Sequence, residues 1–276
     1  MNAELLAVGF GLLSAISWGA GDFGGGLASR RAHPYAVTVL VSATGLLLFT
    51  LLALLRGETF FPRDVGWAVL AGASGALGLL SLYRAFTAGQ MGLAAPVAGV
   101  TGAVLPVLLG AALEGLPGGL QLLGFGMGLL GVWLASRPEG AVRPAGLTWA
   151  LLAGLGFGGY FALIDRVEGL FWPSAIAKLT ALALTLAYAL LKRPERWPRL
   201  RELPLVGLAG ALDAGGNLFF LAAAQSGRLD VAAVVSSLYP ASTVLLARAV
   251  LNERLRPAQG LGVLLSLGAI ALISAG

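Results

Sequence analysis

Apolar residues form long runs along the whole chain, and short polar segments separate these runs. A helix needs about 20 apolar residues to cross the hydrocarbon core of a bilayer. Ten runs approach that length, at residues 4–27, 34–55, 65–88, 92–113, 119–136, 145–165, 172–191, 203–225, 229–251 and 257–275. Lipid cannot satisfy exposed backbone N–H and C=O groups, so segments that cross it must be helical. The pattern predicts an all-α integral membrane protein with ten transmembrane helices.

The composition favours the same class. Of 276 residues, 58% are hydrophobic and 11% are charged, whereas soluble domains carry about 25% charged residues. Most of the surface must therefore face lipid. The net charge of +5 does not indicate nucleic-acid binding, because the basic residues lie in short gaps between apolar runs. Since there is no cysteine, disulfides and thiolate chemistry are excluded.

The first run has no preceding basic segment of the kind that begins a signal peptide, so we interpret it as the first membrane helix. Cytoplasmic loops of membrane proteins carry an excess of Lys and Arg. One alternating set of connections holds eleven basic residues: Arg30, Arg31, Arg137, Arg143, Lys192, Arg193, Arg196, Arg199, Arg201, Arg254 and Arg256. The other set holds four: Arg56, Arg63, Arg166 and Arg228. This bias predicts a cell-membrane protein with both termini outside the cytoplasm.

The two halves of the chain match each other at an offset of about 139 residues. Trp18 aligns with Phe157 and Pro34 aligns with Pro173, and each proline opens the following run. The segment AGQMGLAAPV (88–97) also aligns with SGRLDVAAVV (226–235). The chain is therefore divided into two repeats.

The repeats, residues 1–139 and 140–276, each hold five predicted spans. Because five is odd, the second repeat begins on the opposite face of the membrane and lies inverted. Inverted repeats allow two near-equivalent packings around a site at the middle of the membrane. This arrangement predicts a carrier that works by alternating access.

The run 229–251 contains Pro240, which is expected to loosen or kink its helix because proline lacks an N–H donor. Glu253 and its neighbours then form a polar turn, and Pro257 opens the last run.

Three stretches resemble EamA-type permeases of the drug/metabolite transporter superfamily. They are YPASTVLLARAVLNERLRPAQGLGVLLSLGAIALI (239–273), its weaker first-half counterpart LPVLLGAALEGLPGGLQLLGFGMGLLGVWL (105–134), and SAISWGAGDF (14–23). The resemblance extends over essentially the whole chain. It implies a secondary transporter of ten helices in two EamA-like repeats, with a central cavity. Such permeases carry small metabolites, amino acids or drugs and are often exporters, without a cofactor.

Ionisable side chains inside the runs are candidates for function, because each costs about 2.5–3.5 kcal/mol near the centre of a membrane helix. Asp213 lies near mid-depth with Asn217 at i+4 on the same face. We interpret Asp213 as a cavity carboxylate that binds an amine or exchanges a proton, or else as a structural partner of Lys178 or an arginine. Lys178 either binds a substrate carboxylate, neutralises Asp213 or extends to the headgroups.

Asp22 and Arg84 are candidates for coupling or gating, together with Asp213. Asp22 either forms a gate ion pair near Arg30 and Arg31 or is an ordinary interface charge. Arg84 lies close to one end of its run, where extension to the membrane surface is the stronger interpretation.

Aromatic and hydroxyl side chains complete the candidate substrate-binding set. Trp18, Tyr83 and Tyr160 either enclose a substrate or pack between helices. Hydroxyl side chains also lie around Pro240 and either form a polar patch in a cavity or join helices by hydrogen bonds; they are Ser236, Ser237, Tyr239 and Thr243.

Two other patterns carry less weight. The stretch Gly126-x-Gly128-x-x-Gly131 fits a dinucleotide fingerprint, but it lies in an apolar run where small residues allow close helix packing. His33 has no second ligand nearby in the sequence, so no metal site is expected.

The expected partners are the lipid bilayer, a small-molecule substrate and protons as the coupling ion, with homodimerisation left open. The alternatives are a membrane-embedded enzyme acting on a lipid and a simple channel.

Overall fold

The computed structural model describes residues 3–88, 91–135, 144–251 and 256–275, and every secondary-structure element in these ranges is helical. All ten predicted runs form helices. Nine of them are continuous: α1 (Ala3–Ser29), α2 (Pro34–Arg56), α3 (Asp64–Ala88), α4 (Met91–Glu114), α5 (Gly119–Ala135), α6 (Pro144–Ile164), α7 (Phe171–Lys192), α8 (Leu203–Ser226) and α11 (Pro257–Ala275). The segment between α7 and α8 contains a short 3-10 helix, η1 (Leu200–Glu202).

The predicted ninth run is divided into α9 (Leu229–Ser236) and α10 (Tyr239–Leu251). Pro240 explains where the break occurs. Proline at this position cannot donate to the carbonyl of Ser236, four residues earlier, and its ring would clash with that carbonyl. Thus α9 ends at Ser236, and Pro240 becomes the second residue of α10. The expected kink is a full interruption.

Helix ends follow the local sequence. Pro34 occupies the first turn of α2, where its missing N–H costs nothing, and His33 Nδ1 accepts a hydrogen bond from the backbone N–H of Tyr35 at 3.4 Å. Gly57 ends the same helix with φ of 61°, in the left-handed region that glycine adopts without a steric penalty.

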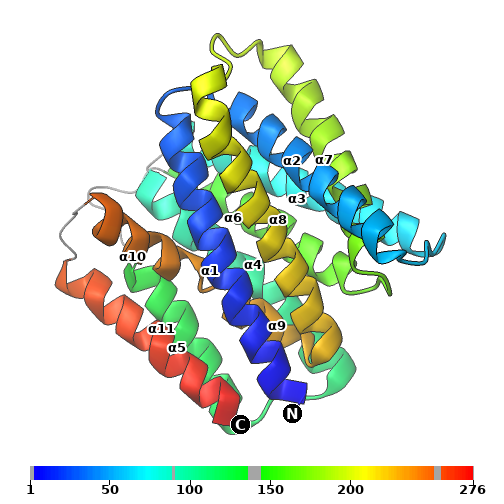
Figure 1. The fold of residues 1–276 in the computed structure, drawn as a ribbon. Coiled ribbons are helices and arrows are strands. Elements are labelled where there is room, and N and C mark those ends of the chain that lie inside the picture. Colours follow the sequence, from blue (N-terminus) through cyan, green and yellow to red (C-terminus); the bar gives the residue numbers. More distant parts are fainter. Residues whose placement is uncertain (1–2, 89–90, 136–143, 252–255, 276) are drawn as a thin grey trace.

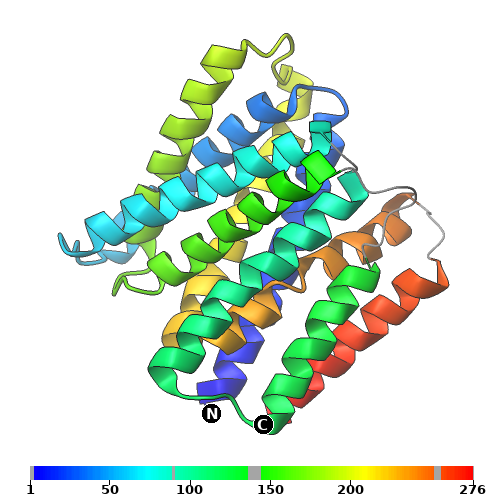
Figure 2. The same cartoon turned by 180° about the vertical axis from the view of Figure 1, so that it is seen from behind.

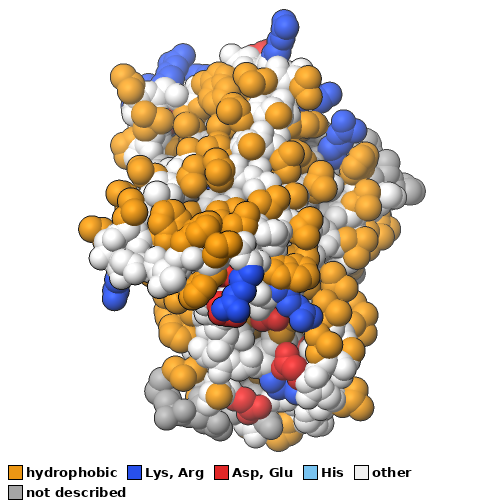
Figure 3. All heavy atoms as spheres, turned by 90° about the vertical axis from the view of Figure 1, so that its right-hand side faces the viewer, with side chains coloured by type: hydrophobic (Ala, Val, Ile, Leu, Met, Phe, Trp, Pro, Cys, Tyr) orange, Lys and Arg blue, Asp and Glu red, His pale blue; other side chains and the backbone are white. Residues whose placement is uncertain are grey.

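Among the described residues, seven helices are long and apolar enough to cross a membrane: α1, α2, α3, α4, α6, α7 and α8. Helices α5 and α11 are also apolar, but their apolar stretches, Gly119–Ala135 and Pro257–Ile273, are shorter. In Figure 3, hydrophobic side chains cover much of the upper part of the face shown, and acidic and basic side chains gather below its middle. The chain is a multi-pass membrane protein.

The largest helix contacts join the two halves of the chain. Helix α1 packs along α8, α3 along α6, α2 along α7 and α5 along α11. Contacts between consecutive helices of one half, such as α1 with α2, are much smaller. Figures 1 and 2 show α5 beside α11, and both termini at the same end of the bundle. The halves are therefore interleaved.

Close approach of α5 and α11 depends on glycine. A Cβ added at Gly131 would lie 2.8 Å from the carbonyl oxygen of Gly262. A larger residue at position 131 would therefore force the two helices apart. Gly128 also faces α11, whereas a Cβ at Gly126 would meet open space. The structure thus gives this glycine-rich stretch a packing role.

Candidate functional site

A cavity of about 190 Å³ lies at the centre of the bundle, between helices of both halves. It is smaller than the roughly 300–1,000 Å³ pockets that hold drug-sized ligands, so it suits a small solute. Its polar and aromatic lining residues include Trp18, Asp22, Thr38, Ser42, Phe157, Tyr160, Lys178, Thr185, Asp213, Asn217, Ser237 and Tyr239.

An ion pair between Lys178 of α7 and Asp213 of α8 forms part of the cavity wall. The side chain of Lys178 is 14% exposed and that of Asp213 is 29% exposed. The aliphatic stem of Lys178 lies along α2, where a Cβ added at Gly45 would be 3.1 Å from Cε. The two residues therefore bind each other and line the cavity. Their role in binding a substrate or exchanging a proton stays a prediction.

Asn217 extends the polar surface of α8 by one turn. Its Nδ2 donates to the backbone carbonyl of Asp213 at 2.6 Å, and Asn217 also lines the cavity. This bond fixes the amide on the face that carries the Asp213 carboxylate. The i+4 spacing indicated this shared face.

Asp22 of α1 is an exposed acidic residue that borders the cavity. Within the described residues, its side chain has no hydrogen bond or ion pair, including none with Arg30 or Arg31. A Cβ at the adjacent Gly21 would lie 3.1 Å from the backbone nitrogen of Asp213. Helices α1 and α8 therefore bring the two acids to the same region of the cavity.

Aromatic rings form one wall of the cavity and the packing behind it. The Trp18 ring stacks on Phe161 and Phe220, with centroid distances of 5.6 and 5.9 Å, and meets the edge of Tyr239 at 6.4 Å. Tyr160 contacts the Phe161 ring at 6.0 Å. Trp18, Tyr160 and Tyr239 thus pack together and line the cavity. Contact of these rings with a substrate stays a prediction.

The break between α9 and α10 decides which serine reaches the cavity. Ser236 is fully buried, its hydroxyl has no hydrogen-bond partner among the described residues, and it is not part of the lining. Ser237 follows the end of α9 and lines the cavity. Applying the i−4 rule to Pro240 would have located this break from the sequence.

Two further candidates lie elsewhere. Arg84 is outside the described lining: its guanidinium lies over the Trp149 ring at 5.1 Å, and its Nε donates to the Tyr188 hydroxyl at 3.5 Å. The side chain of Tyr83 is outside the part that the structure describes. Sequence reasoning missed Thr38 and Ser42 of α2, whose four-residue spacing was the available signal.

The EamA-like transporter family matches the chain over residues 5–137 and 144–275. This chain belongs to that family. The resemblance found in the sequence is thereby confirmed, and the family is one of transporters.

A solved crystal structure shares the fold of this EamA-family chain. The TM-score is 0.81 at 20% sequence identity, and the match covers 96% of this chain and 95% of that chain. At this identity the likeness establishes the fold alone. No curated protein shows significant sequence similarity to the chain.

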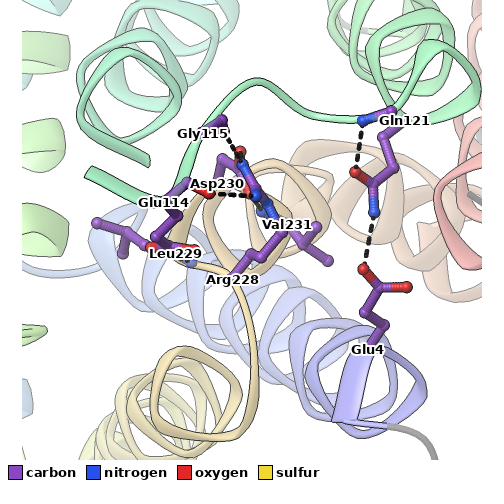
Figure 4. A network of polar contacts seen from close by, with 9 residues as sticks. Glu4, Glu114, Gly115, Gln121, Arg228, Leu229, Asp230 and Val231 are labelled. Atoms are coloured by element: carbon purple, nitrogen blue, oxygen red, sulfur yellow. Dashed lines mark hydrogen bonds and ion pairs between the residues drawn. The ribbon is translucent and has the colours of Figure 1, made fainter. Parts of the chain in front are cut away.

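This EamA-family chain has a second polar cluster at the end of the bundle near the N-terminus (Figure 4). Arg228 donates to both carboxylate oxygens of Asp230, at 3.1 and 2.7 Å. It also donates to the backbone carbonyls of Glu114 and Gly115, at 3.3 and 2.7 Å. Asp230 is fully buried and accepts a further bond from the N–H of Val231. We call this group the Arg228 clasp.

The clasp joins the α4–α5 connection to the start of α9. The hydrogen bond from Arg228 to Asp230 raises the pKa of Arg228 above the ordinary arginine value. Close to the clasp, Gln121 donates to Glu4 of α1 at 3.2 Å (Figure 4). These bonds hold three segments that are distant in the sequence.

Acidic side chains also bind the α6–α7 connection. The Glu58 carboxylate accepts hydrogen bonds from the backbone N–H groups of Leu170, Phe171 and Trp172, where α7 begins. This position is favourable because a helix N-terminus carries unpaired N–H donors and partial positive charge. Asp64 accepts similarly from Glu168 and Gly169, so the connection is fixed to the α2–α3 segment.

Proposed function

We propose that this chain is a secondary carrier that moves small metabolites, amino acids or drugs by alternating access. In this proposal the ten predicted spans form two inverted five-helix repeats, residues 1–139 and 140–276. The solute occupies the central cavity. The observation that carries the proposal is the ion pair of Lys178 and Asp213, which is placed in a cavity between interleaved halves.

The pairing of helices supports a two-fold relation between the repeats. Such a relation would exchange α1 with α6 and α3 with α8, so the α1–α8 contact would become the α6–α3 contact. These are the two most extensive helix contacts. The same relation would exchange α2 with α7 and α5 with α11. The members of each of these pairs contact each other, which also fits the exchange. Two related halves supply the two alternative packings that alternating access requires.

The cavity chemistry supports exchange of a solute with protons. Asp213 and Asp22 are acids within the bundle, and only Asp213 has an ion-pair partner among the described residues. A carboxylate can hold either a proton or a cationic group at different stages of a transport cycle. Export is the direction that the likeness to EamA-type permeases implies.

The proposal is tested by solute counterflow in proteoliposomes. Vesicles are loaded with amino acids, nucleosides, sugars or organic cations, uptake of each labelled solute is measured, and a trapped pH dye follows proton movement. We expect saturable counterflow for at least one solute class, which separates a carrier from a channel and from an enzyme. Absence of counterflow for every class contradicts the proposal.

The matched variants are Asp213→Asn and Glu195→Gln. We expect Asp213→Asn to reduce counterflow at least about tenfold, equivalent to about 1.4 kcal/mol. Glu195 lies exposed in the α7–η1 connection, away from the cavity lining, so its variant should transport normally. Unchanged transport and unchanged proton movement in Asp213→Asn would remove this residue from the mechanism.

A further inference from the structure

Among the described residues that line it, the cavity has more acidic than basic side chains. Among its described lining residues are two carboxylates, Asp22 and Asp213, and one cationic group, Lys178. The Lys178 ammonium is already bound to Asp213. One carboxylate, that of Asp22, is therefore left without a counter-charge in the described part of the chain.

An unpaired carboxylate in a membrane protein interior is costly unless water, a proton or a cation compensates it. From this imbalance we infer that the transported solute is a small organic monocation, such as a protonated amine with an apolar body. Its charged group binds Asp22, while Lys178 and Asp213 stay paired. The inference rests on the proposed carrier function and assigns its substrate class.

The aromatic wall suits the same solute. Trp18 lies four residues before Asp22 on α1, so the two side chains share one face, a single helical turn apart. A cation bound at Asp22 would place its apolar body against Trp18 and the neighbouring Tyr239. Aromatic faces attract cations through their quadrupole, most strongly when water is excluded.

Solutes with a negative group fit less well. A carboxylate could bind only Lys178, and it would have to displace Asp213 from that ammonium. The displaced Asp213 and Asp22 would then both border the cavity that holds the anion. The amine of a zwitterion can bind Asp22, but its carboxylate must also displace Asp213 from Lys178. A neutral solute leaves Asp22 uncompensated.

Four probes with one aromatic body and different charges test the inference. They are 2-phenylethylamine (cation), L-phenylalanine (zwitterion), 3-phenylpropionate (anion) and 2-phenylethanol (neutral). Binding to the purified full-length protein in detergent is measured by calorimetry and by the shift in melting temperature. We expect 2-phenylethylamine to bind at least about tenfold more tightly than each of the others, about 1.4 kcal/mol.

Variants at position 22 locate the effect. Asp22→Asn should remove the preference for the amine, whereas Asp22→Glu should keep it because the charge remains. Glu195→Gln, remote from the cavity, should bind like the unaltered chain. Size-exclusion profiles and melting curves establish that each variant is folded, and Asp22→Glu keeps the test decisive if Asp22→Asn does not fold.

Three results would overturn the inference: tightest binding of the anion or the zwitterion, binding without charge discrimination, or an amine preference that survives in folded Asp22→Asn. These results leave the carrier proposal standing if counterflow of some solute is saturable. Conversely, amine-selective binding without counterflow of any solute supports the charge assignment and contradicts the carrier proposal.

Discussion

Two ion pairs in this protein join a carboxylate to a cation in opposite ways. The Asp230 carboxylate is fully buried and accepts three hydrogen bonds, two from Arg228 and one from the N–H of Val231. The Asp213 carboxylate is 29% exposed to the cavity, and Lys178 is its ion-pair partner. The first carboxylate is saturated by protein donors, whereas the second can still bind water or a solute.

The difference indicates a division of roles. A buried arginine–carboxylate pair with all its groups satisfied holds connections in place, because separating it leaves two charges uncompensated. A partly exposed lysine–aspartate pair can open at lower cost because the cavity rehydrates its partners. We therefore propose a structural role for the Arg228 clasp and a role in the transport cycle, through proton exchange, for the pair of Lys178 and Asp213.

The clasp also distinguishes the two repeats. In the sequence alignment, Arg228 and Asp230 correspond to Gln90 and Gly92, which cannot form an ion pair. Thus the matching sequence of the first repeat lacks the means to build the same clasp. We therefore expect the clasp to oppose opening of its own end of the bundle, because separating it leaves buried charges uncompensated.

The largest expected effect on stability is that of Asp230→Ala. This change leaves Arg228 without its carboxylate partner, so we expect the free energy of unfolding to fall by about 3–5 kcal/mol. Denaturant titration of the purified protein measures this loss. A decrease below about 1 kcal/mol would show that the clasp does not hold the connections together.

A smaller loss of stability is expected for Asp213→Asn, the variant used in the counterflow test. Because both side chains of the Lys178 pair are partly exposed, the free energy of unfolding should fall by about 1 kcal/mol or less. The same titration measures it, with Asp230→Ala in parallel. Equal losses in the two variants would remove the distinction between a structural and a functional pair.

A further effect on stability is a pH dependence near the clasp, outside the membrane-spanning helices. Burial raises the pKa of Asp165 to about 6, the nearby Glu114 adds to the rise, and Arg166 opposes it. Because the folded-state pKa exceeds the ordinary value of 3.8, the unfolded state loses its proton first as the pH increases. The stability contribution of Asp165 should therefore decrease from about pH 4 to about pH 6 and then stay constant.

Asp165→Asn is the matched control for this pH dependence, since it cannot ionise. Unfolding free energies measured across the same range should decline less in the variant than in the unaltered chain. Identical slopes would mean that another group controls the pH dependence at this end of the bundle.

Most of the helical architecture could be predicted because a bilayer imposes strict length and polarity on each crossing. The predicted run 34–55 corresponds to the helix Pro34–Arg56, and the run 172–191 corresponds to the helix Phe171–Lys192. The ninth run was harder, because its apolar pattern continues through Pro240. The interruption after Ser236 follows from the missing N–H and the ring of Pro240, and not from hydrophobicity.

The residues of the candidate site were harder to predict from the sequence than the helices. Asp213 and Asn217 share a helix, so their spacing indicated a common face. Thr38 and Ser42 were missed because hydroxyls in apolar helices commonly bond to their own backbone, as Thr38 does to the Pro34 carbonyl at 3.0 Å. The clasp was missed because the partners of Arg228 at Glu114 and Gly115 are more than a hundred residues away.

Alternating access itself is tested most directly by side-specific labelling of the cavity. The chain contains no cysteine, so single cysteines can be introduced at Ser42 or Ser237, which line the cavity, and at exposed Glu195 as the control. Intact cells and inverted vesicles carrying each variant are treated with a membrane-impermeant maleimide. We expect Ser42→Cys and Ser237→Cys to react from both sides of the membrane and Glu195→Cys from one side only. Labelling of both cavity positions from the same single side, with and without solute gradients, would contradict alternating access.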